Sequence, residues 1–150
     1  DVRSMGRSSY GVRGIDLGRG DEVVSIESLP KDGKTTILTV TTKGFGKRSD
    51  LEEYRKTARA GKGVINLKTG DKVGDVVSSL SVDNKDSVIA TTAKGMTLRA
   101  TMKDLRVMGR ATQGVHVIRL KEGDKVVDVV KVPREDKILA GAEVQQNLDD

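Results

Sequence analysis

A six-residue frame, Arg-x-x-x-Gly-Val, occurs three times in this chain, and this repetition limits the folds available to it. The copies are RSSYGV at 7–12, RAGKGV at 59–64 and RATQGV at 110–115, at offsets of 52 and 51 residues. Self-similarity at a period near 50 residues is typical of architectures in which each repeat is one supersecondary unit packed on its neighbours. The frame predicts about three units in residues 1–134, with approximate boundaries 7–58, 59–109 and 110–134.

Two further frames share this period. Gly-Asp-x-Val begins at Gly20, Gly70 and Gly123, and ILTVTTKGFGKR at 37–48 aligns without a gap with VIATTAKGMTLR at 88–99. Between turn residues the apolar side chains recur with a period close to two, which is typical of short strands. We therefore expect an all-β fold, a β-pinwheel or propeller-like array of four-stranded blades. Only 50–56 and 102–107 have a briefly helical pattern, and we interpret them as loops or single turns.

The composition excludes several functional classes. The chain contains no cysteine and one histidine, His116, so it lacks the residues for disulfides, thiolate metal sites and histidine-based triads. It also lacks an apolar run long enough to span a membrane. We expect a soluble cytoplasmic protein with no cofactor, no metal ion and no catalytic residue of its own. His116 is expected on a strand edge or at the surface.

The charge is distributed unevenly along the chain. Residues 1–134 hold 26 Lys and Arg against 17 Asp and Glu, whereas residues 135–150 hold one Lys against five acids. A basic body followed by an acidic tail is a common signature of nucleic-acid binding, although a soluble basic protein with a solvated end has the same balance. Because Tyr10, Phe45 and Tyr54 are the only aromatic residues, base stacking on a single strand is disfavoured, and double-stranded DNA held through its phosphates fits better.

The candidate DNA-binding residues are the basic side chains in or near the repeated frames. They are Arg7, Arg13, Lys43, Lys47, Arg48, Arg59, Lys62, Lys94, Arg99, Arg110 and Arg119. For the frame arginines the sequence leaves two roles open: a contact to DNA phosphate, or a hydrogen bond to carbonyl groups of a neighbouring repeat. The frame glycines Gly11, Gly63 and Gly114 are expected at turns whose backbone conformation disfavours a side chain.

Three stretches resemble the C-terminal β-pinwheel domain of the DNA gyrase A subunit, which is also found in the related topoisomerase IV subunit. They are MGRSSYGVRGIDLGRGDEVVS at 5–25, TTKGFGKRSDLEEYRKTARAGKGVINLK at 41–68 and VMGRATQGVHVIRLKEGDKVV at 107–127. The resemblance implies a disc of strand-exchanging blades whose basic rim wraps duplex DNA and supports supercoiling by a type II topoisomerase. The partners that it implies are the remaining gyrase A domains and the gyrase B subunit.

The resemblance is closest to late blades of the pinwheel. The family's signature box is matched only by TARAGKG at 57–63, which keeps Arg59, Gly61, Lys62 and Gly63 and which we interpret as a degenerate copy. With about three blades, the chain is expected either to be the C-terminal half of a larger subunit or to close its ring as a homodimer. Gyrase and topoisomerase IV are not separated by these residues, and a propeller-like protein-interaction module is the alternative function.

Overall fold

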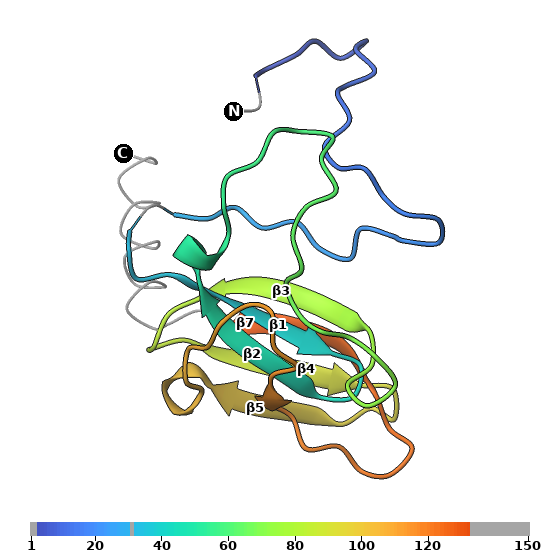
Figure 1. Ribbon diagram of the computed structural model, residues 1–150. Helices are drawn as coiled ribbons and strands as arrows, with labels where there is room; N and C mark the ends of the chain where they lie inside the picture. Colours follow the sequence, from blue (N-terminus) through green and yellow to red (C-terminus); the bar gives the residue numbers. More distant parts are fainter. Residues whose placement is uncertain (1–2, 31, 133–150) are drawn as a thin grey trace, which may run out of the picture.

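The computed structural model describes residues 3–30 and 32–132, which form two antiparallel β-sheets (Figure 1). The first sheet has the order β3-β1-β2-β6, with β1 at Thr36–Thr41, β2 at Phe45–Asp50, β3 at Val76–Val82 and β6 at Val115–His116. The second has the order β5-β4-β7, with β4 at Ser87–Thr92, β5 at Thr97–Thr101 and β7 at Val126–Val132. Short 3-10 turns, η1 at Leu51–Glu53 and η2 at Met102–Asp104, follow the two hairpins. The predicted all-β fold is confirmed, and the two briefly helical segments are single turns.

The repeat in the sequence is a repeat in the backbone. Hairpin β1–β2 pairs Thr36 with Asp50, and hairpin β4–β5 pairs Ser87 with Thr101, 51 residues later. The pairing of β1 with β3 has a register irregularity after Val40 of β1. The pairing of β4 with β7 has one at the same repeat position, after Thr91 of β4. The two sheets are therefore copies of one structural unit.

Each sheet combines strands from different repeats. The hairpin β1–β2 comes from the first repeat, whereas its neighbours β3 and β6 come from the second and third repeats. Hairpin β4–β5 has β7 on one side, and among the described residues no strand pairs with the other edge of β5. Strands are thus exchanged between repeats, as the pinwheel resemblance implies: β3 and β7 join the hairpin of the preceding repeat, and β6 joins the hairpin two repeats before it.

One apolar core joins the two sheets. It contains small branched side chains from the central strands, together with residues that follow β5 and β6, and the chain has no tryptophan to fill such a core. The buried members are Leu38, Val40, Val82, Val88, Ala90, Met102, Leu105, Ile118, Val126 and Val129. Each Å² of apolar surface that is removed from water contributes about 25 cal/mol to the free energy of folding, so this cluster is the main source of stability.

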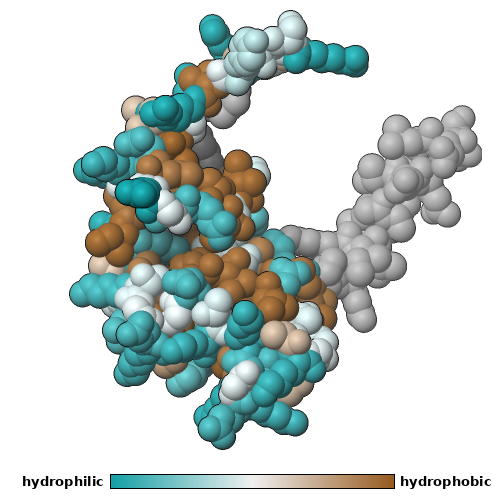
Figure 2. Space-filling view, turned by 90° about the vertical axis from the view of Figure 1, so that its right-hand side faces the viewer, coloured by the Kyte–Doolittle hydropathy of each residue, from teal (hydrophilic) through white to brown (hydrophobic). Residues whose placement is uncertain are grey.

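Residues 3–30, which we call the N-terminal arm, form no strand and extend away from the sheets at the top of Figure 1. The arm is held at two places. Ile15 bridges to Gly61, and the side chains of Ser25 and Glu27 accept hydrogen bonds from the backbone N–H groups of β3. Apolar side chains of the arm stay exposed, and brown surface lies open among teal regions in Figure 2. They are Met5, Tyr10, Val12, Ile15, Leu17, Val23, Val24, Ile26 and Leu29.

Two further expectations from the sequence concern the acidic tail and membrane-spanning segments. The predicted acidic tail at 135–150 lies outside the described residues. Within the described ranges, no helix has the length and apolar character needed to cross a bilayer.

Candidate nucleic-acid interface

Two of the candidate cations are buried, and this revises their predicted role. Lys47 and Arg48 on β2 are 1 % and 2 % exposed. The Lys47 ammonium donates to the carbonyl oxygen of Gly109 at 3.0 Å. Arg48 donates to the carbonyls of Met102 (2.8 Å) and Leu105 (3.3 Å), and also to side chains on both flanks. In this structure both cations hold the following repeat in place and are not presented to a duplex.

Arg99, the equivalent of Arg48 one repeat later, lies in a different environment. Both arginines donate Nε to the hydroxyl that ends the pairing of their own hairpin, Thr36 or Ser87. Arg48 is then covered by Asn84 and by the turn after β5, whereas Arg99 stays exposed because no described segment covers it. Arg99 remains a candidate for phosphate contact.

The lysines of the two hairpin turns are exposed but already bound through their ammonium groups. Lys43 donates to the carbonyl of Asp71, and Lys94 donates to the carbonyl of Glu122 at 2.8 Å. Each lysine therefore ties its hairpin turn to the Gly-Asp loop of the next repeat. An ammonium group has three donors, so each retains capacity for a phosphate oxygen.

The three frame arginines differ in their contacts. Arg110 donates from Nη1 to the carbonyl of Ile65 at 2.7 Å, which is the carbonyl-bonding role left open by the sequence. Arg7 and Arg59 lie exposed at the surface of the described part of the chain. The same frame position is therefore structural in one copy and open to solvent in the other two.

Two backbone hydrogen bonds join the N-terminal arm to residues 60 and 61, next to three of the candidate DNA-binding residues. The backbone N–H of Ala60 donates to the carbonyl of Gly14 at 2.9 Å, and the N–H of Asp16 donates to that of Gly61 at 3.0 Å. Arg13, Arg59 and Lys62 stand next to these paired residues. We call these three residues, which come from segments 46 residues apart in the sequence, the arm junction.

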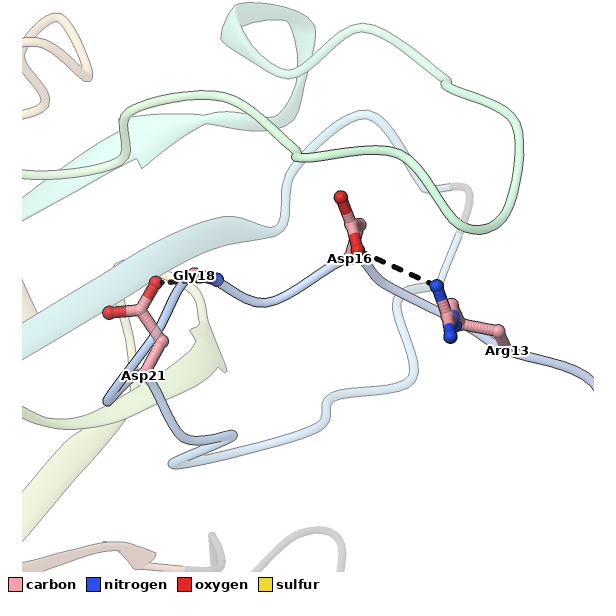
Figure 3. Close-up of polar contacts among 4 residues, drawn as sticks. All are labelled: Arg13, Asp16, Gly18 and Asp21. Carbon is pink, nitrogen blue, oxygen red and sulfur yellow. Dashed lines mark hydrogen bonds and ion pairs between the residues drawn. The ribbon is translucent and has the colours of Figure 1, made fainter.

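Figure 3 shows the arm side of this junction. Arg13 Nη1 pairs with Asp16 Oδ1 at 3.6 Å, and the N–H of Gly18 donates to Asp21 Oδ2 at 3.1 Å. The Arg13 side chain is 72 % exposed, so the ion pair is solvated and contributes little stability. Arg13 remains a candidate for phosphate contact.

The remaining predicted site residues lie at the surface or in turns. Arg119 is exposed. The frame glycines Gly11, Gly63 and Gly114 have φ values of 78°, 77° and 78°, which is left-handed backbone that favours glycine. At Gly114 a Cβ would also overlap the carbonyl of Gly46, so this copy needs glycine for close approach as well.

Burial changes the acid–base properties near β2. It lowers the pKa of Lys47 to about 8, with Arg110 acting in the same direction and Glu53 opposing it. Burial also raises the pKa of Tyr54, whose hydroxyl donates to Asn66 Oδ1. Asn66 in turn donates to Thr39 Oγ1 at 2.7 Å, so Tyr54 anchors the connection between repeats.

Sequence reasoning missed two exposed lysines beside Arg48. Lys34 and Lys85 line an open hollow of about 500 Å³ together with Asp50 and Asp83. The mixed charges make this hollow a poor anion site. Lys34 and Lys85 are 51 residues apart and occupy the same repeat position, just before the aligned segments 37–48 and 88–99, so the repeat could have pointed to them.

The described residues offer no group of three or more His, Asp or Glu side chains able to hold a metal ion. His116 is exposed on β6, as expected, and its ring lies 3.9 Å from that of Phe45. The exposed candidate cations lie apart from one another along the chain and do not line a single described pocket.

A family model described as "DNA gyrase C-terminal domain, beta-propeller" matches residues 1–30, 35–83 and 86–133. The chain belongs to the DNA gyrase C-terminal domain family. It is 40% identical over 146 residues to the DNA gyrase A subunit of Chlamydia pneumoniae, covering 95% of this chain and 17% of that protein. It is 45% identical over 131 residues to the DNA gyrase A subunit of Fibrobacter succinogenes, covering 87% and 14%. This member of the gyrase family thus spans less than a fifth of the length of these relatives.

Solved structures of the family have the same fold. A C-terminal domain of DNA topoisomerase IV superposes with a TM-score of 0.78 at 27% identity, covering 90% of this chain and 43% of that chain. A DNA gyrase A C-terminal domain superposes with a TM-score of 0.76 at 27% identity, covering 88% and 44%. The β-pinwheel resemblance inferred from the sequence is therefore confirmed.

Proposed function

We propose that this chain binds, bends and wraps double-stranded DNA through the phosphate backbone, without reading sequence, and supports supercoiling. In this proposal it acts in the cytoplasm as the C-terminal part of the A subunit of a type II topoisomerase, DNA gyrase. Its partners are then duplex DNA, the remaining gyrase A domains and the gyrase B subunit. The gyrase assignment is preferred to topoisomerase IV because the full-length relatives described above are gyrase A subunits.

The surface charge is the observation that carries this proposal. Among the described residues, 21 Lys and Arg side chains are exposed against 12 exposed Asp and Glu. The cations come from both sheets and from the arm, so the positive surface is extended and not confined to one pocket. A surface of this kind gains affinity for DNA by releasing condensed counterions from the phosphates.

The aromatic residues support a duplex over a single strand. Phe45 is partly buried and faces His116, and Tyr54 is held by Asn66. Only Tyr10 is fully open. Single-strand binding relies on aromatic platforms that stack successive bases, and one exposed tyrosine does not form such a platform.

The test is DNA affinity across a salt series, for a duplex of ~40 base pairs and for one of its strands. We expect tighter duplex binding, with log K falling against log salt by about 0.9 for each phosphate contacted. The double variant Arg59→Glu with Lys62→Glu, at the arm junction, should weaken duplex binding and reduce this slope. The double variant Lys85→Glu with Lys103→Glu makes the same change in net charge at residues outside the candidate set and should have a smaller effect.

Equal losses of duplex affinity in the two double variants would mean that binding depends on net charge alone, and this would contradict a defined DNA-binding surface. Duplex affinity no greater than single-strand affinity would contradict the proposal as a whole. That second result would favour the alternative of a protein-interaction module, for which the exposed apolar arm is the candidate contact surface.

A further inference from the structure

The carboxylate of Glu53 lies where the end of hairpin β1–β2 meets the segment before β6. Glu53 is the last residue of η1, the short turn that follows β2 (Figure 1). Its Oε2 accepts a hydrogen bond from the backbone N–H of Arg110 at 3.4 Å, and the same oxygen lies 4.0 Å from the point where a Cβ on Gly109 would stand. A negative group of the first repeat is therefore placed against the backbone that begins the third repeat.

Two cations share the surroundings of this carboxylate. The Lys47 ammonium donates to the carbonyl of Gly109, the residue directly before the N–H that Glu53 accepts from. Burial lowers the pKa of Lys47, Glu53 opposes this shift and Arg110 adds to it, so both neighbouring charges act on the ammonium group. One backbone N–H and two cationic side chains thus surround a single anionic group.

Glu53 is a weakly held occupant of this position. Its side chain is exposed, and its bond to the N–H of Arg110 is longer than the usual range of about 2.7–3.2 Å for N–H···O bonds. Ion pairs of exposed side chains contribute little to stability, because water solvates the separated charges almost as well. The carboxylate can therefore turn into solvent at small cost.

A phosphate group suits the same position. The Arg110 guanidinium has five N–H donors, and among the described residues it makes one hydrogen bond, from Nη1 to the carbonyl of Ile65 at 2.7 Å. This bond holds the side chain in place and leaves donors for a phosphate, which guanidinium groups bind through two parallel hydrogen bonds. Backbone N–H groups are also regular donors to DNA phosphates. Lys47 stays buried and adds its positive charge without contact.

We propose that the N–H and guanidinium of Arg110 form a binding position for one backbone phosphate of duplex DNA, and that Glu53 is an internal competitor which this phosphate displaces. The inference rests on the proposed function, of which it describes one contact and its regulation. Glu53 then holds the duplex affinity of the chain below the value that its cations allow. The competition is local, because it involves one carboxylate and one phosphate.

Duplex affinity across the salt series tests the competition. Glu53→Gln removes the charge but keeps the size of the side chain, and it should raise the association constant about fivefold, the upper range for an exposed ion pair. The slope of log K against log salt should steepen by up to about 0.9, because the phosphate contact no longer replaces an internal one. Glu52→Gln is the matched control. Glu52 is also exposed on η1, it forms no hydrogen bond or ion pair with the described residues, and its replacement changes the net charge equally. We expect less than a twofold gain from it, and equal gains in the two variants overturn the inference.

A titration with inorganic phosphate tests the position without DNA. The readout is the backbone amide signal of Arg110 in two-dimensional nuclear magnetic resonance spectra. Phosphate should shift this signal at lower concentrations in Glu53→Gln than in the unchanged chain, whereas Glu52→Gln should behave as the unchanged chain. If the signal of Glu53→Gln does not respond, the phosphate position is refuted, whether or not the chain binds DNA. A response without duplex binding supports the position and contradicts the proposed function alone.

Discussion

Replacing Arg48 by alanine should destabilise the protein far more than replacing Arg99, although the two residues occupy the same position in consecutive repeats. Arg48 is 2 % exposed, and its guanidinium donates to the carbonyls of Met102 and Leu105. Arg99 is exposed, and among the described residues its side chain bonds only to Ser87 of its own hairpin. The pair therefore separates the local effect of the side chain from the effect of its burial.

The magnitude follows from the groups that Arg48 leaves behind. A buried carbonyl that loses its donor costs about 1–3 kcal/mol, and Arg48→Ala removes the side-chain donor of the Leu105 carbonyl, whereas the carbonyl of Met102 keeps the N–H of Leu105 at 3.2 Å. The buried stem of Arg48 also loses its packing. Thr36 keeps its own bond to Val82, and Asn84 is exposed to water, so neither adds much. Water entering from the adjacent hollow of about 500 Å³ offsets part of the loss. We expect a loss of about 3 kcal/mol in the free energy of unfolding for Arg48→Ala, and less than about 1 kcal/mol for Arg99→Ala.

Urea unfolding, followed by far-ultraviolet circular dichroism, measures this difference. With a slope of about 2 kcal/mol per M, a 3 kcal/mol loss lowers the midpoint by about 1.5 M. Arg48→Lys retains the charge but not the planar fork, so it should lie between the wild type and Arg48→Ala. Equal midpoints for Arg48→Ala and Arg99→Ala would refute the reasoning, because they would mean that the buried contacts carry no net free energy.

Two further predictions concern contacts between hairpin β1–β2 and residues 107–118. Gly44→Ala should destabilise by about 1–3 kcal/mol more than Gly95→Ala in thermal unfolding, because both introduce a side chain at a positive φ but only the first also collides with Ile118; equal melting temperatures would contradict this. Burial lowers the pKa of Lys47 to about 8, so between pH 8 and about 9.5 the unfolded state binds more protons than the folded state and stability rises with pH. The slope should approach about 1.4 kcal/mol per pH unit and disappear in Lys47→Met, and an unchanged slope in that variant would assign the effect to another group.

The buried lysine and arginine also limit how a loss of DNA binding is to be interpreted. A substitution at Lys47 or Arg48 removes contacts to the following repeat, so it weakens DNA binding through the fold if at all. Substitutions at Arg59 and Lys62 act on exposed side chains and leave these contacts intact. DNA affinities of variants should therefore be compared only after their unfolding midpoints are known.

The sequence by itself determined the repeat, the strand-rich units and the positions of their turns. Its period of 51 residues placed the two hairpins in equivalent positions, because identical turn chemistry and alternating apolar residues give the same local structure. It also indicated glycine at the frame turns, where φ is positive, since that preference is local to one residue. The basic excess of the body was readable as well, because charge is a sum over residues.

Only the tertiary structure decided which of the equivalent cations face solvent. Arg48 and Arg99 are indistinguishable within the repeated frame, yet one is covered by Asn84 and the turn after β5 and the other is not. Arg110 bonds to a carbonyl of the preceding repeat, whereas Arg59 in the same frame position is exposed. The physical reason is that burial depends on which segment packs over a side chain, and strand exchange brings that segment from another repeat.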